Sequence, residues 1–344
     1  MHLSDFDYHL PPELIAQTPI EPRDHSRLLN INVSTQSITE TKFFDILDKL
    51  GDNDILVLNK TRVINARLHG TIENGKLVEI FLHKQISDNT WDCLVFPGKK
   101  LKPGKVIHFN LNNNIVMTSI VKEISDSGRI IEFDIGGIQF LEIVEKLGSI
   151  PLPPYIKEKL ENNERYQTVF NEIEGSVAAP TAGLHFTGEL LKKLKNKGVK
   201  IEKVLLHVGL GTFKGVETEN ILEHKMHSEY IELEQDTATR LNDYKSKGKR
   251  IIAVGTTSIR VLESFSNENG ILEAGSKDTN IFIYPGYTWK FVDAIITNFH
   301  LPKSTLLMLV SSFAGTELIK KAYKYAVDNK FKFFSFGDAM FIEK

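Results

Sequence analysis

The residues best suited to chemistry lie in a loop of small side chains around one histidine. Residues 175–187 read GSVAAPTAGLHFT, where glycine and alanine leave backbone amides accessible and His185 offers a ring that titrates near neutral pH. A tight turn carrying a hydrogen-bonded histidine would explain the same residues. The candidate ligand contacts in this loop are Thr181, Ala182, Gly183 and Thr187.

Other segments place similar residues at the ends of predicted strands. Each alone could be a turn or a helix cap. In a parallel α/β sheet, however, ligands collect at the carboxyl ends of the strands, and a helix start binds a carboxylate or another anion. One shared site therefore explains all the segments together. Its candidates are His207, Gly209, Gly211 and Thr212 in LLHVGLGTF; Thr256, Thr257, Ser258 and Arg260 in VGTTSIR; Asn298, His300, Lys303 and Ser304 in TNFHLPKST; and Asp338 in SFGDA.

The segment HKMHSE raises a different possibility, a metal site. His224 and His227 are three residues apart and would share one face of a helix. The chain has no HExxH motif and only one cysteine, Cys93. We therefore expect no metal, and we place His227 among the acid/base candidates.

Composition limits the partners and the compartment. The 344 residues carry a net charge of -2, so nucleic acid would be held by local basic patches rather than by overall charge. The loop with Lys99, Lys100 and Lys102 is such a patch, although a solvated face is the alternative. A single cysteine, no signal peptide and no long apolar run predict a cytoplasmic protein without a membrane span.

The chain changes character twice, which predicts a discontinuous α/β fold. Residues 62–133 contain only short strand patterns, and 148–154 form a proline-rich connector after a helix at 140–147. We expect an α/β domain of residues 1–60 and 150–344, with a mostly parallel, distorted barrel-like sheet, and an inserted β-barrel of residues 61–149. The α/β part has predicted strands at 55–59, 200–208, 250–254, 292–297 and 331–336, and helices at 188–197, 236–247, 303–315 and 322–329.

Taken together, these motifs resemble the S-adenosylmethionine:tRNA ribosyltransferase-isomerases. The resemblance runs through LSDFDYHLPPELIAQTPIEPRDHSRLL, LVLNKTRVINARL, GSVAAPTAGLHFT, HVGLGTF, HKMHSE, GTTSIR, TNFHLPKSTLLML and FSFGDAM in one order. It implies transfer and isomerisation of the ribosyl part of S-adenosylmethionine onto 7-aminomethyl-7-deazaguanine at the tRNA wobble position. The implied products are epoxyqueuosine in tRNA, adenine and methionine, and the family is similarly organised as an α/β domain with an inserted barrel.

The chemistry implied by this resemblance suits the residues. His185, His207 and His300 are the acid/base candidates, with His227 behind them and Asp338 as an orienting or leaving-group acid. Thr256, Thr257 and Ser258 would hold the methionine carboxylate. Which histidine is the base stays open, and so do two other classes of protein, a non-catalytic RNA-binding protein and a metal-dependent hydrolase. We expect a monomer that uses S-adenosylmethionine as co-substrate and tRNA as partner.

Overall fold

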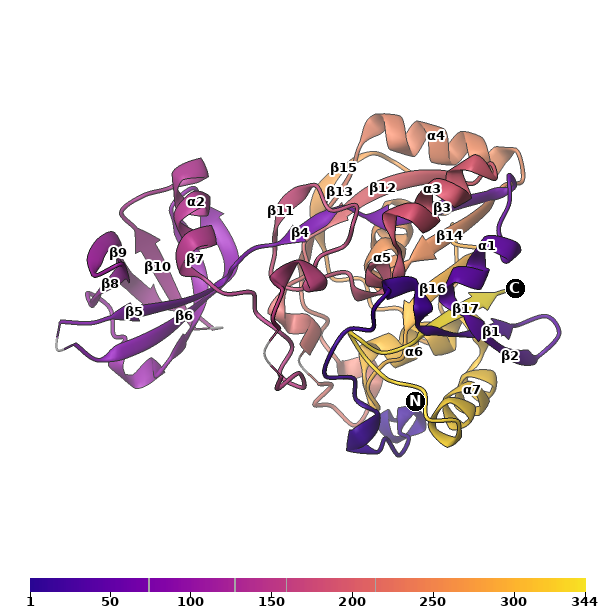
Figure 1. The fold of residues 1–344 in the computed structure, drawn as a ribbon, viewed down its shortest axis with the longest axis horizontal. Coiled ribbons are helices and arrows are strands. Elements are labelled where there is room, and N and C mark those ends of the chain that lie inside the picture. The colour runs from indigo at the N-terminus through magenta and orange to yellow at the C-terminus, as the bar shows by residue number, and fades with distance from the viewer. Residues whose placement is uncertain (74, 127, 159, 214) are drawn as a thin grey trace. The chain divides into compact units, whose positions relative to one another are not determined.

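The chain divides into two compact units. The structure is a computed structural model that describes residues 1–344 apart from Asn74, Ser127, Lys159 and Lys214 (Figure 1). The larger unit comprises Met1–Arg62, Pro154–Ile173 and Ala179–Lys344, and the smaller comprises Val63–Pro153 and Glu174–Ala178. The chain leaves the larger unit after Arg62 and re-enters it at Pro154, a few residues beyond the predicted boundaries at 60 and 149. Residues 174–178, predicted to belong to the α/β domain, are part of the smaller unit. That the smaller unit is a separate folding domain stays a prediction.

The larger unit is built on one open sheet. Its nine strands, counted over the described residues, run in the order β15-β13-β12-β3-β14-β16-β17-β1-β2. The middle four strands are parallel, while the flanks are antiparallel except for the parallel pair β1 and β17. The strands are β1 (Arg27–Asn32), β2 (Ser37–Lys42), β3 (Asp54–Asn59), β12 (Lys200–Leu206), β13 (Glu229–Leu233), β14 (Arg250–Val254), β15 (Gly275–Thr279), β16 (Ala294–Asn298) and β17 (Ala339–Glu343).

Helices pack against this sheet because its central strands are apolar on both faces. All six residues of β3 are buried, as expected of a parallel strand covered on both sides. Leu56, Ile252 and Ile296 from neighbouring strands share one core with Phe186 and Leu190. The α-helices of this unit are α1 (Ile46–Lys49), α3 (Gly188–Asn196), α4 (Gln235–Ser246), α5 (Gly255–Phe265), α6 (Thr305–Ala314) and α7 (Thr316–Asp328). The helices expected at 188–197, 236–247, 303–315 and 322–329 are confirmed, as are the strands at 55–59, 200–208, 250–254 and 292–297.

Short 3-10 helices form much of the remaining chain of the larger unit. They are η1 (Leu3–Phe6), η2 (Pro12–Leu14), η3 (Arg23–His25), η4 (Phe43–Asp45), η6 (Asn163–Tyr166), η7 (Thr181–His185), η8 (Leu210–Phe213) and η9 (Ile221–Glu223).

The strand expected at residues 331–336 is wrong. The backbone there forms an irregular turn, and its aromatic side chains pack around Phe299. The ring centroid of Phe299 lies 5.6 Å from that of Phe331 and 4.9 Å from that of Phe333. Phe334 has a φ of 71°, which is incompatible with an extended strand. The last strand is instead β17, so Asp338 precedes a strand rather than following one. The apolar run at 331–336 resembles a buried strand in sequence, because a buried irregular turn hides its phenylalanines from water as a strand would: all four rings are buried.

The smaller unit is a closed antiparallel barrel. Its strands run in the order β10-β7-β6-β5-β8-β9 among the residues described, and its core contains Trp91, Phe109, Phe133 and Phe140. The expected all-β module is confirmed. The barrel consists of β5 (Arg67–Thr71), β6 (Leu77–Ser87), β7 (Thr90–Phe96), β8 (Val106–Leu111), β9 (Asn114–Ile124) and β10 (Arg129–Phe133), with η5 (Gly98–Lys100) and α2 (Gly137–Leu147). A two-stranded ladder pairs β4 (Thr61–Val63) with β11 (Ile173–Ser176). Within the described part of the chain, none of the helices combines the length and apolarity needed to span a bilayer.

Candidate active site

One edge of the large sheet gathers most of the candidate residues. The parallel strands β12, β3, β14 and β16 all end there. β17 starts at the same edge, because it is antiparallel to β16 and pairs Ala339 with Asn298. β1 starts there as well, because it is parallel to β17. Asp338 therefore reaches the expected edge, although from the beginning of a strand.

His185 lies at this edge in a group of neutral hydrogen bonds. Its Nδ1 is 2.7 Å from Ser26 Oγ, and its Nε2 is 3.0 Å from Asn298 Nδ2. Asn298 Oδ1 accepts a hydrogen bond from Thr181 Oγ1 at 3.0 Å, which orients the amide so that its nitrogen faces the ring. The Nδ1 of His185 then carries the proton and donates to Ser26. We call Ser26, Thr181, His185 and Asn298 the His185 group.

Burial keeps this imidazole uncharged. It lowers the pKa of His185 to about 3, and among the residues that the structure describes no carboxylate contacts the ring. One face of the ring stacks on Phe43, with the centroids 5.0 Å apart. His185 is thus a neutral ring at neutral pH whose two nitrogens are both occupied. A substrate that used Nε2 would have to displace the Asn298 amide.

The start of α5 lies at the same edge and has no side-chain cap. β14 runs directly into the helix at Gly255, whose φ of 83° favours glycine, and Val254 provides no side-chain cap. Thr257 Oγ1 is buried and has no hydrogen-bond partner within the part of the chain that is described. A β-carbon at Gly255 would lie 3.6 Å from the Ala182 methyl, so the loop of η7 borders this helix start. Free amides and an unpaired hydroxyl suit a carboxylate.

Not every residue of VGTTSIR faces that space. Ser258 is fully buried, and its hydroxyl donates to the Val254 carbonyl at 2.8 Å. Arg260 is buried one turn further along the helix, where it pairs with Glu229. The predicted carboxylate contact of Ser258 and the predicted substrate contact of Arg260 therefore compete with bonds inside the protein.

Glu229 is a central residue that the sequence reasoning missed. Its side chain is 1% exposed. Oε1 accepts hydrogen bonds from Gly209 N at 2.9 Å and Thr212 Oγ1 at 3.0 Å, and it lies 3.4 Å from His227 Nε2. The other carboxylate oxygen pairs with Arg260. We call Gly209, Thr212, His227, Glu229 and Arg260 the Glu229 group.

A signal for Glu229 was present in the sequence. Glu229, Ile231 and Leu233 alternate as the buried positions of β13, so the carboxylate occupies an inward-facing position of a strand. Gly211 leaves room for His227 of this group, because a β-carbon at position 211 would lie only 2.4 Å from the His227 ring. Gly183 serves packing in the same way, since a β-carbon there would lie 2.6 Å from the Phe170 ring. These two glycines allow close packing rather than leaving open space for a ligand.

His207 follows β12 and has the more accessible ring. Its Nδ1 lies 2.8 Å from Thr61 Oγ1, and its ring stacks near Tyr230 with the centroids 5.9 Å apart. Burial lowers the pKa of His207 to about 4. Thr61 is the one described residue that hydrogen-bonds the ring, so Nε2 is available to a substrate.

His300 lies deeper. The ring Nε2 of His300 is 3.2 Å from Thr297 Oγ1. Its backbone N–H donates to Tyr323 Oη at 2.9 Å, and its backbone carbonyl accepts from Tyr8 Oη. Burial lowers the pKa of His300 to about 3. These bonds tie β16 to α7 and the N-terminal segment.

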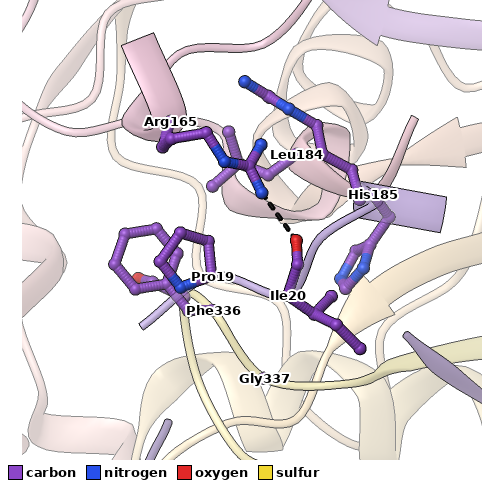
Figure 2. Close-up of a pocket in the computed structure, with 9 residues that line it drawn as sticks. Pro19, Ile20, Arg165, Leu184, His185, Phe336 and Gly337 are labelled. Carbon is purple, nitrogen blue, oxygen red and sulfur yellow. Dashed lines mark hydrogen bonds between the residues drawn. The ribbon is translucent and has the colours of Figure 1, made fainter. Parts of the chain in front are cut away.

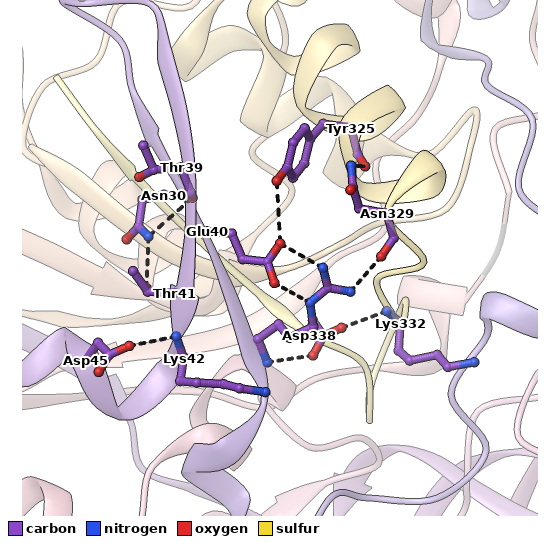
Figure 3. A network of polar contacts seen from close by, with 11 residues as sticks. Asn30, Thr39, Glu40, Thr41, Lys42, Asp45, Tyr325, Asn329, Lys332 and Asp338 are labelled. Atoms are coloured by element: carbon purple, nitrogen blue, oxygen red, sulfur yellow. Dashed lines mark hydrogen bonds and ion pairs between the residues drawn. The ribbon is translucent and has the colours of Figure 1, made fainter.

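Asp338 connects the final turn to β1 (Figure 3). Its two carboxylate oxygens accept hydrogen bonds from Arg27 N and Lys332 N, each at 2.7 Å. Burial raises the pKa of Asp338 despite these two donors. The Arg27 side chain pairs with Glu40, which also receives the Tyr325 hydroxyl. Asp338 therefore fits an orienting role, whereas its predicted role as a leaving-group acid would have to compete with two backbone amides.

The remaining predicted residues lie in other local structures. Thr187 caps α3 and donates to Asp24, and Ser304 caps α6. Lys303 pairs with Asp7 at 2.9 Å. Thr256 lies in the first turn of α5, and Lys99, Lys100 and Lys102 are exposed on the barrel unit. Among the described residues, no set of three or more histidine, cysteine, aspartate and glutamate side chains is grouped to hold a metal ion.

Buried neutral histidines beside an uncapped helix start, at the edge of an α/β sheet, are typical of an enzyme site. Comparison with known proteins identifies which kind of enzyme. A family model described as "Queuosine biosynthesis protein" matches residues 3–342. The S-adenosylmethionine:tRNA ribosyltransferase-isomerase of Fusobacterium nucleatum is 54% identical over 342 residues, which cover 99% of this chain and 97% of that protein.

A solved structure agrees. The crystal structure of S-adenosylmethionine tRNA ribosyltransferase from Thermotoga maritima has a TM-score of 0.57 and 37% sequence identity, over 98% of this chain and 100% of that one. The chain belongs to the queuosine biosynthesis protein family and is an enzyme of the transferase-isomerase class found in it. The family resemblance in the sequence is thus confirmed.

Proposed function

We propose that this enzyme transfers and isomerises the ribosyl part of S-adenosylmethionine onto 7-aminomethyl-7-deazaguanine at the wobble position of tRNA. The products are epoxyqueuosine-tRNA, adenine and methionine. The protein acts in the cytoplasm as a monomer, without a metal. The names of the two relatives support the donor and the tRNA, and the base at the wobble position follows from the family resemblance.

The start of α5 carries the proposal for the donor. Its uncapped amides, and the buried Thr257 hydroxyl that has no partner within the described part of the chain, offer a place for the methionine carboxylate. Thr256 lies in the same first turn. The adenosyl part then extends along the sheet edge past Ala182 and the His185 group.

His207 is the leading candidate for moving protons. The sulfonium of the donor acidifies the adjacent 5′ carbon, so a neutral imidazole with a free nitrogen can take that proton. His207 is uncharged at neutral pH and has Nε2 available, whereas both nitrogens of His185 are occupied. Removal of the proton allows the ribose ring to open and expel adenine. His185 and His300 then orient the reacting groups, and His227 and Asp338 hold the surrounding loops.

Product release tests this assignment. Purified protein given S-adenosylmethionine and tRNA bearing 7-aminomethyl-7-deazaguanine should release adenine and methionine, and release should require the modified tRNA. His207→Ala should lower turnover about 10²- to 10⁴-fold, the usual contribution of a positioned acid or base. Thr257→Val should raise the KM for the donor, while Thr239→Val, at an exposed position of α4, is the matched control and should leave it unchanged. Formation of S-adenosylhomocysteine instead of adenine would show methyl transfer and contradict the proposal.

The barrel loop is our proposed RNA contact. Lys99, Lys100 and Lys102 are exposed on a turn that Arg129 fixes by donating to the Gly98 and Leu101 carbonyls at 2.8 and 2.6 Å. Neutralising the three lysines should weaken tRNA binding and reduce its salt dependence by up to about three units of log–log slope. An unchanged slope in a salt titration would exclude these phosphate contacts. We also propose that the barrel is a separately folding domain, which proteolysis near residues 59–62 and 148–154 would reveal.

A further inference from the structure

The aromatic ring nearest to His185 on its open side is enclosed. Phe336 lines a hollow beside His185 together with Pro19 and Leu184, and it is 7% exposed (Figure 2). The hollow has about 20 Å³ of space, which is room for one water molecule. Phe336 therefore offers no face to a flat ligand such as a nucleobase.

One aromatic side chain of the barrel unit, in contrast, faces solvent. Six phenylalanine and tryptophan residues lie between positions 63 and 153. Phe96, at the end of β7, is 73% exposed. A phenylalanine ring gains most by leaving water, so a ring left outside a barrel that encloses its other rings indicates a surface for a partner. The other five are at most 7% exposed and are Phe81, Trp91, Phe109, Phe133 and Phe140.

The strand register places Phe96 in a row of exposed side chains. Phe96 pairs with Glu79 of β6, and Glu79 pairs with His69 of β5. These three side chains lie on the outer face of the sheet, because the next residue of β6, Ile80, is buried in the barrel. Leu77 is 71% exposed and lies two residues before Glu79, so it is a diagonal neighbour of Phe96 on the same face. We call His69, Leu77, Glu79 and Phe96 the Phe96 face.

The segment that follows the ring supplies positive charge. Residues 96–105 contain four lysines and no acidic residue. Lys99 and Lys100 are exposed in η5, and the chain allows them to lie no more than about 14 Å from the Cα atom of residue 96. The carboxylate of the Phe96 face belongs to Glu79, whose Oε1 lies 3.9 Å from Arg67 Nε and is partly neutralised by it. The surroundings of the ring therefore favour a polyanion.

The turn that carries these lysines is fixed in the free protein. Arg129 of β10 donates from Nη2 to the Gly98 carbonyl at 2.8 Å and from Nε to the Leu101 carbonyl at 2.6 Å. The Lys100 amide donates to the Pro97 carbonyl at 3.1 Å and closes the turn. A surface that is ordered before binding loses little conformational entropy when a partner arrives.

We propose that Phe96 is a stacking platform for one unpaired base of the tRNA, with Lys99 and Lys100 at the adjoining phosphates. The proposal rests on the proposed function, which supplies tRNA as the partner. Proteins that bind single-stranded nucleic acid combine exposed aromatic rings with basic surfaces, because every base has a flat face that stacks. A second copy of the chain or another protein would bury the ring as apolar surface and would not require an aromatic side chain.

Substitutions of Phe96 in the full chain test the platform. Phe96→Ala should raise the Kd for tRNA bearing 7-aminomethyl-7-deazaguanine about 5- to 150-fold, the usual effect of losing one aromatic–base stack. Phe96→Tyr keeps a ring and should bind as wild type does. Phe96→Leu keeps apolar surface without a ring and should bind as weakly as Phe96→Ala. Ile86→Ala is the matched control, because Ile86 is 56% exposed and lies about 23 Å along β6 from Glu79.

Salt dependence separates stacking from charge. Stacking releases no counterions, so Phe96→Ala should leave the log–log slope of Kd against salt concentration unchanged, whereas neutralising the lysines should reduce it. An unchanged Kd in Phe96→Ala, an equal loss in Ile86→Ala, or full binding by Phe96→Leu would overturn the proposal. A changed sedimentation coefficient with unchanged tRNA binding in Phe96→Ala would assign the face to a second copy of the chain and overturn it as well.

The platform and the proposed function fail in different measurements. If wild-type protein bound the modified tRNA but released no adenine from S-adenosylmethionine, the reaction assignment would be wrong, and the Kd values of the Phe96 variants would still decide the platform. If wild-type protein released adenine and Phe96→Ala bound tRNA normally, the proposed function would stand and the platform alone would be overturned.

Discussion

The His185 group and the Glu229 group are both associated with one sheet edge but are built on different physical terms. The His185 group contains no charge, since neutral donors and acceptors satisfy an imidazole that burial keeps unprotonated. The Glu229 group contains a buried carboxylate paired with a buried arginine. A neutral group can exchange one partner for a substrate at small cost, whereas a buried ion pair cannot lose a member cheaply. The comparison therefore suggests that the His185 group meets the substrate and the Glu229 group holds the framework.

Breaking the ion pair should have the largest effect. Arg260→Met leaves the Glu229 carboxylate buried without its partner and should lower the free energy of unfolding by about 3–5 kcal/mol. The double variant Arg260→Met with Glu229→Gln should recover part of that loss, because the second change removes the unpaired charge. Urea denaturation of the single and double variants measures both values. A small loss in Arg260→Met alone would show that water reaches the pair and that the two groups are less different than the burial indicates.

The acid sensitivity of the His185 group should come next. The pKa of His185 is about 3 in the folded protein and about 6.5 in an unfolded chain, so the unfolded state binds more protons as the pH falls. The free energy of unfolding is therefore unaffected by this ring above pH 6.5. Below pH 6.5 it falls, by about 2 kcal/mol at pH 5. His185→Gln should flatten the decline in unfolding free energy between pH 7 and pH 5. Ser26→Ala removes a contact of the ring but leaves the ring in place, so it should keep the wild-type pH dependence. If the unfolding free energy of all three proteins declined equally between pH 7 and pH 5, a neutral buried ring would be refuted.

The smallest expected effect is the difference in stability between two threonine substitutions, one in each group. Thr181→Val removes a hydrogen bond to a neutral amide and should cost about 1 kcal/mol, whereas Thr212→Val removes one to a carboxylate and should cost about 1.5–3 kcal/mol. Thermal unfolding of both variants under one condition gives the comparison. A larger cost in Thr181→Val would reverse the assignment of framework and substrate group.

The sequence predicted more of the fold than of the site. Apolar periodicity located β14 at residues 250–254 and α3 almost to the residue, because strands and helices bury one face or both in a regular pattern. The same reasoning failed at residues 331–336, where phenylalanines pack around Phe299 without forming a ladder. Periodicity records which side chains are buried, but not whether backbone hydrogen bonds accompany them.

For the site, the sequence by itself determined the residue types, their order along the chain and the edge of the sheet at which they meet. Strand direction follows from connectivity, so residues after parallel strands had to converge there. Only the tertiary structure decided which of them serve a ligand and which serve the fold. Thr257 has a buried hydroxyl with no hydrogen-bond partner among the residues described, while Ser258 bonds to its own helix and Gly211 makes room for His227. Glu229 became central for the same reason, since the partners of a buried polar atom are set by contacts between distant segments, and these are not encoded in local spacing.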